Sequence, residues 1–586
     1  MKKLILPFIA LAFIFSCGTD PGTVGGLTKL NGGKFGGGVL KINEVEDFRN
    51  LYPLNIIEEP SLHIASQIYE GLVKLSAKDL SVIPALAESW DKNSEATVWT
   101  FHIRKGVKFH NDECFEGGKG REISANDFKW CFDNLCTASP HNQWFDGTFK
   151  GKVKGADEYY RSTKDKKPLA GGVSGIKVTD DQTLEITLTR PMAGFLNMLV
   201  IPGSYLFPKE AVAKYGEEGM RARAIGTGPF TLKVVKEGEV VILEKNPDYW
   251  GKDSDGNSLP YLETIRISFI KEKKQELIEF KKGNLDLIYR IPTENIKDIL
   301  SDLDKAKENK PFELQVNPAI SIFYYGLLTT AKPFDNKLVR LAFNYAIDRK
   351  KIVEYTLKGE GIPATFGIVP PIPAFESKGY NFKGLKGYTY DPDHAKKLLT
   401  EAGFPNGKGF PRITLQINSG GSDRNVLTAQ VVQSMLKENL NIDINIEMLP
   451  FTQHLEKMAS GQSAFFRTGW ISDYPDPESF LTLLSGSNVP FDPAEKSFLN
   501  TTRFKNAKFD SLFAVANRET DEKMRFELYS RADQVQLDEG AIMPIFYEEI
   551  YRLLQNRVKD FYVNAMEYRD ISRVYLIPER DKEENQ

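Results

Sequence analysis

The eleven residues RTGWISDYPDP contain three side chains that can hold a charged ligand, Arg467, Trp470 and Asp473. An arginine pairs with a carboxylate and an aspartate pairs with an ammonium group, so the stretch predicts a site for a ligand that carries both charges. The alternative interpretation is a strand that ends in a turn and carries a surface salt bridge, which contributes little to stability. Pro475 and Pro477 disfavour a helix and stiffen the loop in which they lie.

These side chains need a strand and a loop to position them. Residues 464–469 (AFFRTG) have the pattern of a strand, and residues 470–477 form the loop that leaves it, where clefts commonly acquire polar groups. Because helical and strand periodicity alternate along the chain, the fold class is α/β or α+β. The periodicity predicts helices over 61–75 and 123–135, a strand within 97–111, and two strands around an Asp-Asp turn over 175–190.

Length and composition limit the function classes. A chain of 586 residues is too long for one hydrophobic core and predicts two or more domains. A net charge of -3 gives no basic surface for nucleic acid. The sequence contains no GxGxxG fingerprint, P-loop or GxSxG elbow, so we expect neither an enzyme nor a cofactor. We expect no metal site either, because the six histidines are scattered: His63, His102, His110, His141, His394 and His454.

The first residues, MKKLILPFIALAFIFSCGTD, have the features of a secretory signal. Lys2 and Lys3 precede an apolar run that is too short to span a bilayer. The run ends in IFSC, which resembles a bacterial lipoprotein cleavage box, in which the cysteine, here Cys17, is acylated and becomes the first residue of the mature protein. The alternative is an ordinary cleavage site that happens to hold a cysteine. Residues 18–38 are rich in glycine and predict a flexible tether.

Three cysteines remain beyond the lipidation site: Cys114, Cys131 and Cys136. An exported protein permits disulfides, so Cys114 can pair with either of the other two and leave one thiol free. The alternative is three unpaired thiols. No CxxC or Cys/His spacing indicates zinc.

A series of short segments occurs in an order that resembles one protein family. These segments span roughly residues 40–550 and include IYEGLVKL, VIPALAESW, WTFHIRKGVKFHN, ISANDFKW, AIGTGPFTL, LEKNPDYWGKD, FKKGNLDL, KPFDNKLVRLAFNYAIDRKKI, YDPDHAKKLLTEAGF and GWISDYPDP. Together they resemble the extracytoplasmic solute-binding proteins of ABC importers, family 5, and within that family the dipeptide- and oligopeptide-binding group. One segment alone would be weak support, but many in the same order are specific.

The resemblance implies an α/β fold of the type II periplasmic binding proteins, with two lobes, an additional inserted subdomain and a central ligand cleft that closes over the ligand. Proline-bounded and apolar segments near 311–318 and 541–549 fall where the two hinge strands of the family would lie. The expected domains are a signal peptide (1–16), the acylated cysteine and tether (17–38), lobe I (39–78), the inserted subdomain (79–205), lobe I again (206–310), lobe II (311–546), and a return to lobe I with the C-terminal tail (547–586).

The resemblance also implies a function. It indicates a lipid-anchored receptor that binds di- or oligopeptides between its lobes and delivers them to the permease subunits of an ABC transporter. In peptide-binding relatives the aspartate of the W-x-x-D motif pairs with the peptide's α-amino group and the tryptophan lines the ligand; here they are Asp473 and Trp470. In oligopeptide-binding relatives an arginine six residues before the aspartate can meet the peptide carboxylate, and the resemblance assigns this position to Arg467.

Such a receptor is expected to be an exported monomer, periplasmic or at the cell surface, and held to a bacterial membrane by its lipid. Two alternatives stay open at this point. The first is a receptor of the same family for a non-peptide solute, such as a sugar, a metal chelate or heme. The second is a surface lipoprotein that serves as an interaction scaffold.

Overall fold

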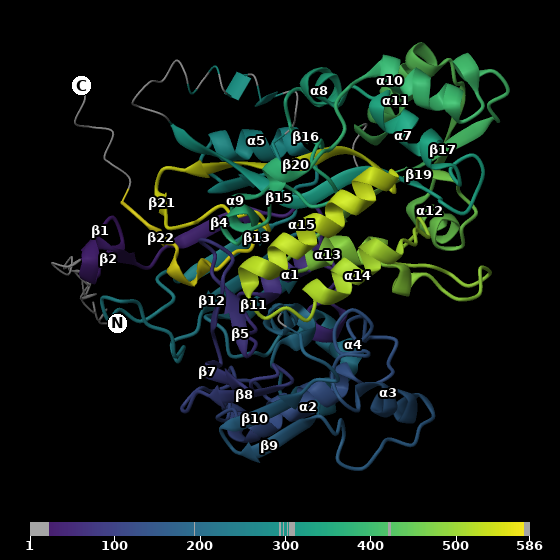
Figure 1. Cartoon of the computed structure of the whole chain (residues 1–586). Helices are drawn as coiled ribbons and strands as arrows, with labels where there is room; N and C mark the ends of the chain where they lie inside the picture. The colour runs from purple at the N-terminus through teal and green to yellow at the C-terminus, as the bar shows by residue number, and fades with distance from the viewer. Residues whose placement is uncertain are drawn as a thin grey trace, which may run out of the picture.

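The computed structural model describes residues 23–192, 194–291, 311–419 and 424–578, together with positions 295, 296, 298, 299, 301 and 303 (Figure 1). The predicted signal peptide and Cys17 lie outside the described residues. Within those residues, no helix combines the length and the apolar character needed to cross a bilayer. The inserted subdomain is taken as residues 79–205, lobe II as residues 311–546, and lobe I as residues 39–78, 206–310 and 547–586; these boundaries stay a prediction.

A mixed sheet with the strand order β14-β20-β15-β19-β17-β18, and β16 beside β20, connects the lobes. Its two long antiparallel strands, β15 (Phe312–Leu327) and β20 (Ile542–Gln555), contain most of the segments predicted as hinges. Phe312 and Leu553 are buried in one apolar cluster, whereas Phe323 and Phe546 are buried in another, so both strands run from one core to the other. The other strands are β14 (Leu287–Tyr289), β16 (Ile362–Pro363), β17 (Ile413–Asn418), β18 (Ile444–Leu449) and β19 (Phe465–Ile471).

Lobe II is built from parallel strands and the helices that connect them. Strand β17 pairs in parallel with both β18 and β19, and helices α11 (Arg424–Leu440) and α12 (Phe451–Ala459) make the crossovers. The carboxyl ends of β17 and β19 therefore meet at one edge of the sheet, where open α/β sheets commonly bind ligands. The other helices are α7 (Lys337–Tyr345), α8 (Arg349–Lys351), α9 (Pro373–Ser377), α10 (Pro392–Glu401), α13 (Glu478–Leu481), α14 (Ala507–Ala516) and α15 (Glu522–Glu539).

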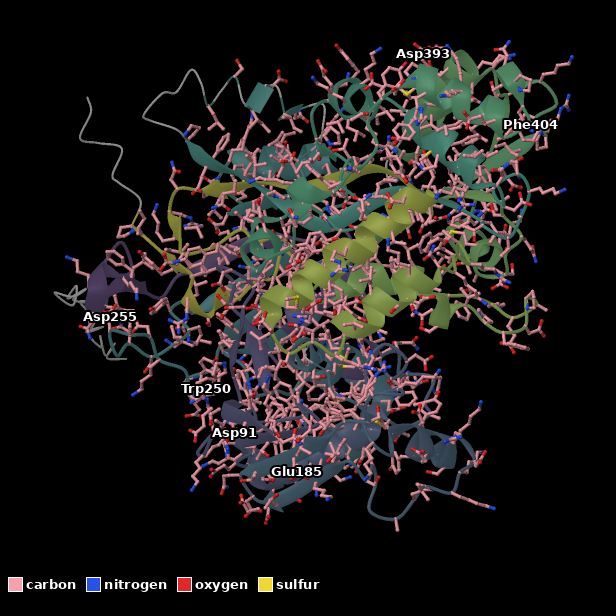
Figure 2. The ribbon with its side chains drawn as sticks, viewed as in Figure 1. Asp91, Glu185, Trp250, Asp255, Asp393 and Phe404 are labelled. Atoms are coloured by element: carbon pink, nitrogen blue, oxygen red, sulfur yellow. The ribbon has the colours of Figure 1, made fainter. Side chains whose placement is uncertain are left out.

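The inserted subdomain forms a sheet of its own, in the order β7-β8-β10-β9. The side chains of Trp99, Phe101 and Ile103 alternate with polar ones along β8 and enter the core, as the period-two pattern predicts. Figure 2 labels Asp91 and Glu185 on this sheet, and Asp393 and Phe404 at the far end of lobe II. The elements are β7 (Ala87–Lys92), β8 (Val98–Ile103), β9 (Ile176–Asp180), β10 (Thr183–Thr187), α2 (Ala125–Leu135) and α3 (Ala156–Lys164).

Lobe I contains a further sheet, in the order β11-β12-β13-β4, in which only the pair β13 and β4 is parallel. Its strands are β4 (Val39–Asn43), β11 (Phe230–Lys236), β12 (Val240–Lys245) and β13 (Thr264–Ser268). The remaining elements are α1 (Glu59–Ala65), α4 (Lys209–Gly219), α5 (Lys273–Lys281), and the hairpins of β5 (Val73–Leu75) with β6 (Val82–Pro84) and of β21 (Val558–Lys559) with β22 (Tyr575–Leu576).

The prediction of one helix over residues 61–75 is wrong. Helix α1 ends at Ala65, and the chain then turns and enters β5. The carbonyl oxygens of Gln67 and Ile68 accept hydrogen bonds from the backbone of Phe230 and Gly228, at 3.0 and 2.8 Å. Because these carbonyls bond to a distant segment, the helix cannot continue, and tertiary contacts override a helical apolar pattern.

The prediction of a flexible tether is wrong for residues 23–38. These residues form a small sheet of β1 (Thr23–Val24), β2 (Leu27–Lys29) and β3 (Phe35–Gly36). Lys34 pairs with Asp253 at 3.0 Å and with Asp255 at 3.2 Å, which fastens this sheet to lobe I beside the labelled Asp255 in Figure 2. The glycines provide the positive φ angles of its tight turns, as at Gly25 and Gly26.

Candidate ligand-binding site

A cavity of about 860 Å³ lies between the inserted subdomain and lobe II and contains two of the three residues predicted to bind a ligand, Trp470 and Asp473. Its volume lies within the usual range for small-molecule sites. The charged side chains that line it are Asp146, Lys150, Lys152 and Arg190 from the subdomain, and Asp473, Asp476, Glu478, Lys496, Asp510, Arg518 and Arg525 from lobe II.

The loop that follows β19 shapes the lobe II wall of this cavity. The Ser472 backbone N–H donates to the carbonyl of Ile320 in β15 at 3.0 Å, which ties the loop to the central sheet. The Ser472 hydroxyl donates to the carbonyl of Tyr474, and the Tyr474 hydroxyl donates to Glu478. The loop then passes through Pro477 into helix α13. These bonds hold Asp473 at the cavity while its own carboxylate takes no part in them.

The carboxylate of Asp473 is unpaired within the described part of the chain. Its carboxylate accepts no hydrogen bond and forms no ion pair with any residue that the structure describes, and it faces the cavity. Its side chain is exposed within the open cavity, and desolvation by the surrounding walls, together with repulsion from Glu478, raises its pKa to about 6, while attraction by Lys152 opposes this shift. A carboxylate held in such a place without a partner attracts a cation.

The carboxylate of Asp476, unlike that of Asp473, is fully paired. It is buried and accepts from Arg525 Nη1 at 2.6 Å and from the Glu478 backbone N–H at 3.0 Å. Asn197 Nδ2, from the inserted subdomain, also donates to its carboxylate, at 3.2 Å. The pair of Asp476 and Arg525 therefore also holds the subdomain against lobe II at the edge of the cavity.

Trp470 lies between the cavity and the core. Its indole Nε1 donates to the hydroxyl of Ser479 at 3.1 Å, which fixes the ring at the base of α13. The ring lines the cavity with one part and packs against the main apolar cluster with another. The structure thus brings Trp470 and Asp473 to the same cavity.

Arg467 lies outside this cavity. Successive residues of a strand face opposite sides, so Arg467 and Trp470, three positions apart in β19, point away from each other. The Arg467 guanidinium lies over the ring of Phe323, 4.7 Å from its centroid, and donates to Asn418 Oδ1 at 3.3 Å. Burial lowers its pKa, and no carboxylate within the described ranges pairs with it.

A second arginine, Arg424, packs beside Arg467 against a pair of stacked phenylalanine rings. The Phe323 and Phe546 rings stack with centroids 4.7 Å apart, and Arg424 lies 4.4 Å from the centroid of Phe546. Arg424 pairs with Glu548 at 3.6 Å. This cluster consequently carries one cation that lacks an acidic partner among the described residues, Arg467.

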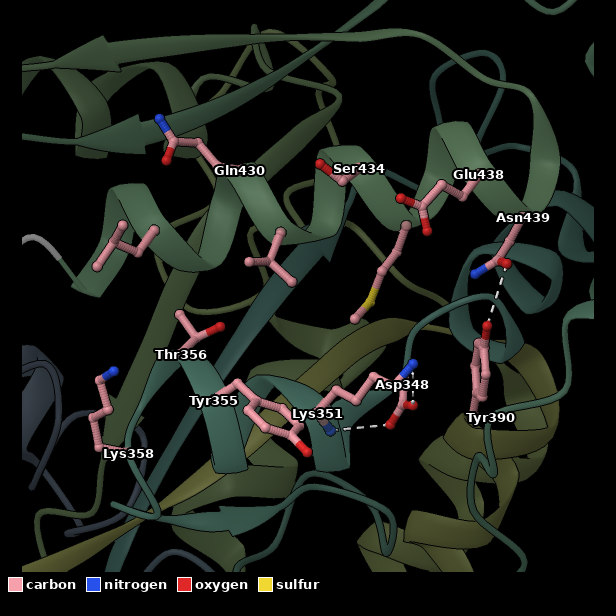
Figure 3. Close-up of a pocket in the computed structure, with 13 residues that line it drawn as sticks. Asp348, Lys351, Tyr355, Thr356, Lys358, Tyr390, Gln430, Ser434, Glu438 and Asn439 are labelled. Carbon is pink, nitrogen blue, oxygen red and sulfur yellow. Dashed lines mark hydrogen bonds and ion pairs between the residues drawn. The ribbon is translucent and has the colours of Figure 1, made fainter.

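Another cavity, of about 500 Å³, lies in lobe II between α11 and the helical turn that follows α8 (Figure 3). Lys351 pairs there with Asp348 at 4.0 Å, and the Tyr390 hydroxyl donates to Asn439 Oδ1 at 3.3 Å (Figure 3). None of the residues predicted to bind a ligand lines it. The first cavity is therefore the candidate site.

The cysteines and histidines do not contribute to the site. Cys114, Cys131 and Cys136 are all free thiols, so the alternative of three unpaired thiols is the one that the structure shows. Burial raises the pKa of Cys131 well above its ordinary value, which makes this thiol unreactive. No group of three or more metal-ligating side chains occurs in the described part of the chain.

Comparison with known proteins identifies the family. Residues 81–491 match the family described as bacterial extracellular solute-binding proteins, family 5 Middle. The chain belongs to this family. The family 5 relatives include the periplasmic oligopeptide-binding protein OppA of Escherichia coli (strain K12), 30% identical over 523 residues that cover 88% of each chain. The dipeptide-binding protein DppE of Bacillus subtilis (strain 168) is 27% identical over 540 residues, which are 91% of each chain.

Solved structures of family 5 proteins share the fold. DppA from Helicobacter pylori, an ABC transporter-associated periplasmic binding protein in complex with the peptide STSA, has a TM-score of 0.73 at 26% identity and covers 92% of this chain and 98% of its own. OppAIV, a periplasmic oligopeptide-binding protein from Borrelia burgdorferi, has a TM-score of 0.70 at 26% identity and covers 92% of this chain and 100% of its own. The predicted family and its two-lobed α/β fold are therefore confirmed.

Four charged residues at the site were not selected from the sequence: Asp476, Glu478, Lys152 and Arg190. Asp476 and Glu478 belong to the same acidic stretch as Asp473, so their spacing was a signal for a charged wall. Lys152 and Arg190 lie about 300 residues earlier and face that wall only because the subdomain packs against lobe II. No local pattern marks these two cations.

Proposed function

We propose that the protein is a lipid-anchored extracytoplasmic receptor that binds di- or oligopeptides and delivers them to the permease of an ABC transporter. The observation that carries this proposal is the unpaired carboxylate of Asp473 in a cavity between two parts of the fold. The named relatives OppA and DppE, and the DppA structure with bound STSA, are peptide-binding proteins and support the same ligand class.

The Asp473 carboxylate is suited to receive the α-ammonium group of a peptide. Every peptide with a free amino terminus carries this group, so its recognition gives affinity without sequence preference. The pairing is charge-assisted, and little order is lost on binding because the loop that holds Asp473 is already fixed by Ser472 and Tyr474. Closure of the lobes over the ligand then captures it, with no chemical step.

The ligand should be identified directly from the purified protein. The body of the protein, without its first 22 residues, is purified from cells and denatured, and the released small molecules are analysed by mass spectrometry. A set of small peptides supports the proposal. A single non-peptide species, for example heme, would replace it, because a relative at 27% identity is named heme-binding protein A of Haemophilus influenzae. An empty protein that also ignores a peptide library would favour an interaction scaffold.

Arg467 is proposed to receive the free carboxylate of longer peptides. The support is a guanidinium on the Phe323 ring that lacks an acidic partner among the described residues. We expect Arg467→Met to weaken binding of a free-acid oligopeptide, measured by calorimetry, by about tenfold, and binding of the same peptide as a C-terminal amide much less. Equal losses for the acid and the amide would make Arg467 a purely structural residue.

Binding should weaken in mild acid, because only the ionised form of Asp473 attracts an ammonium group. With a pKa of about 6, half of the Asp473 carboxyls are protonated at pH 6, so the apparent Kd should about double between pH 7.5 and pH 6 and rise further below it. The ligand-free protein responds in the opposite sense: a pKa above the ordinary value adds stability at low pH that is lost as the pH rises through 6. Calorimetry at several pH values tests this, and Asp473→Asn should flatten the profile. A profile that is already flat in the wild type would contradict it.

The lipid anchor and the transporter partner are part of the proposal. The sequence around Cys17 resembles a lipoprotein cleavage box, and the first described strand begins only six residues later, at Thr23. Acylation would therefore hold lobe I close to the membrane, and the protein would act as a monomer in the periplasm or at the cell surface. The mass of the N-terminal peptide from cells, with Cys17→Ser as the control, tests the modification.

A further inference from the structure

Charges of both signs line the candidate cavity, and the part of each wall nearest Asp473 has a prevailing sign; Lys496, Arg518 and Arg525 lie on the lobe II wall and Asp146 on the subdomain wall. The inserted subdomain contributes the cations Lys150, Lys152 and Arg190, whereas the loop after β19 contributes the carboxylates Asp473, Asp476 and Glu478. A ligand that binds beside Asp473 therefore lies between these subdomain cations and these lobe II carboxylates.

Some of these charges already have partners. Lys150 pairs with Asp146 at 3.0 Å on the subdomain, and Asp476 pairs with Arg525 at 2.6 Å on lobe II. The ammonium of Lys152 donates to the carbonyl of Gly147 at 2.9 Å, which orients it without neutralising it. Neither Lys152 nor Arg190 forms an ion pair with a carboxylate of the described residues. These two are the cations on the subdomain wall that remain available to a ligand.

The available charges interact across the cavity. Burial lowers the pKa of Lys152, repulsion by Arg190 adds to this shift, and attraction by Glu478 and Asp473 opposes it. Repulsion by Glu478 and attraction by Lys152 likewise act on the pKa of Asp473. Lys152, Arg190, Asp473 and Glu478 thus line one cavity of about 860 Å³ and influence one another electrostatically without forming an ion pair among themselves.

We infer that Lys152 and Arg190 form a subsite for a carboxylate of the ligand, opposite the ammonium site at Asp473, so that the cavity selects peptides with a carboxylate close to the amino terminus. The carboxylate is either an acidic side chain at the second residue or the free end of a very short peptide. This inference rests on the proposed function, because it assumes that the ligand ammonium meets Asp473.

The energetics favour a zwitterionic ligand at this position. Lys152 is already partly desolvated, so its pairing with a ligand carboxylate costs less than pairing at the surface. Two adjacent cations repel each other, and an anion between them relieves that repulsion. The subsite is distinct from Arg467, which lies over Phe323 outside the cavity.

The test compares four ligands by calorimetry: Ala-Glu-Ala amide and Ala-Gln-Ala amide, which differ only in the side-chain charge, and Ala-Ala and its amide, which differ only in the terminal carboxylate. We expect the wild type to prefer the charged member of at least one pair by about tenfold. The double variant Lys152→Met/Arg190→Met should lose that preference while it retains affinity for the uncharged member. Lys154→Met, an exposed lysine two residues away, should retain it.

The outcomes separate this inference from the proposed function. A preference in the acidic side-chain pair or in the dipeptide pair identifies which carboxylate the subsite reads. A third outcome separates the two proposals. The wild type could bind these peptides in a manner that depends on Asp473 and yet show the same preference for the charged ligands as the double variant. That result would overturn the subsite and leave the peptide receptor in place. If the wild type binds none of the four, both proposals are overturned. Retained affinity of the double variant for Ala-Gln-Ala amide shows that it is folded.

Discussion

Replacement of Asp473 by asparagine is expected to raise the Kd for a neutral tripeptide at least tenfold, a loss of about 1.4 kcal/mol or more in binding free energy. The amide keeps the size of the side chain but removes its charge, so the ligand ammonium would leave water without a counter-charge. No described neighbour is left with an unmet hydrogen bond, because the Asp473 carboxylate has no partner in the ligand-free protein. Calorimetric titration of wild type and variant measures the effect.

Two controls make this result specific. Asp146→Asn alters another aspartate of the same cavity whose carboxylate pairs with Lys150 at the surface, and it should change the Kd by less than about twofold. An N-acetylated tripeptide lacks the ammonium group, so it should bind the wild type as weakly as the free peptide binds the variant. Acetylation and the substitution together should cost little more than either alone. Independent, additive losses would place the ammonium group away from Asp473.

The sequence could predict those features that depend on local pattern and residue order. The alternation of Trp99, Phe101 and Ile103 with other side chains was enough to predict strand β8. The two strands predicted within residues 175–190 correspond to β9 and β10. Family membership followed from many segments in one order, and the fold with it. Trp470 and Asp473 share a cavity because Trp470 lies near the end of β19 and Asp473 in the loop that follows it, as the short spacing between them indicates.

Features that depend on distant contacts could not be predicted. The glycine-rich residues 23–38 have the composition of a linker, but Lys34 meets Asp253 more than 200 positions later and the segment folds. Helix α1 stops early because distant backbone groups bond to Ile68 and its neighbour. Strand β19 continues to Ile471, two residues beyond the predicted end of the strand, because its backbone pairs with β15 as far as Ser321, and this extension places Trp470 on the face opposite Arg467. Each of these outcomes is fixed by packing and not by local composition.

The largest effect on stability is expected at the ion pair that holds the seam between the subdomain and lobe II. Arg525→Met should lower the free energy of unfolding by about 3–5 kcal/mol, because it leaves the carboxylate of Asp476 buried without a counter-charge. The Asn197 amide would still donate to that carboxylate but cannot neutralise it. Urea unfolding followed by fluorescence measures the loss. Arg531→Met, on the exposed side of the same helix, provides the matched control and should be nearly neutral.

The double variant Arg525→Met/Asp476→Asn decides why Arg525→Met lowers the free energy of unfolding. The cause is either the unpaired buried carboxylate of Asp476 or the lost packing of the Arg525 side chain. If the buried charge is the cause, removal of both charges should restore most of the stability, since a buried pair is often neutral relative to uncharged residues of similar size. If the double variant is as unstable as Arg525→Met, the contacts of the guanidinium with Phe526 and Tyr529 would be the cause instead. Because Asn197 reaches Asp476 from the subdomain, the restored variant should also bind peptide more weakly than the wild type, as an effect of a looser seam and not of the ammonium site.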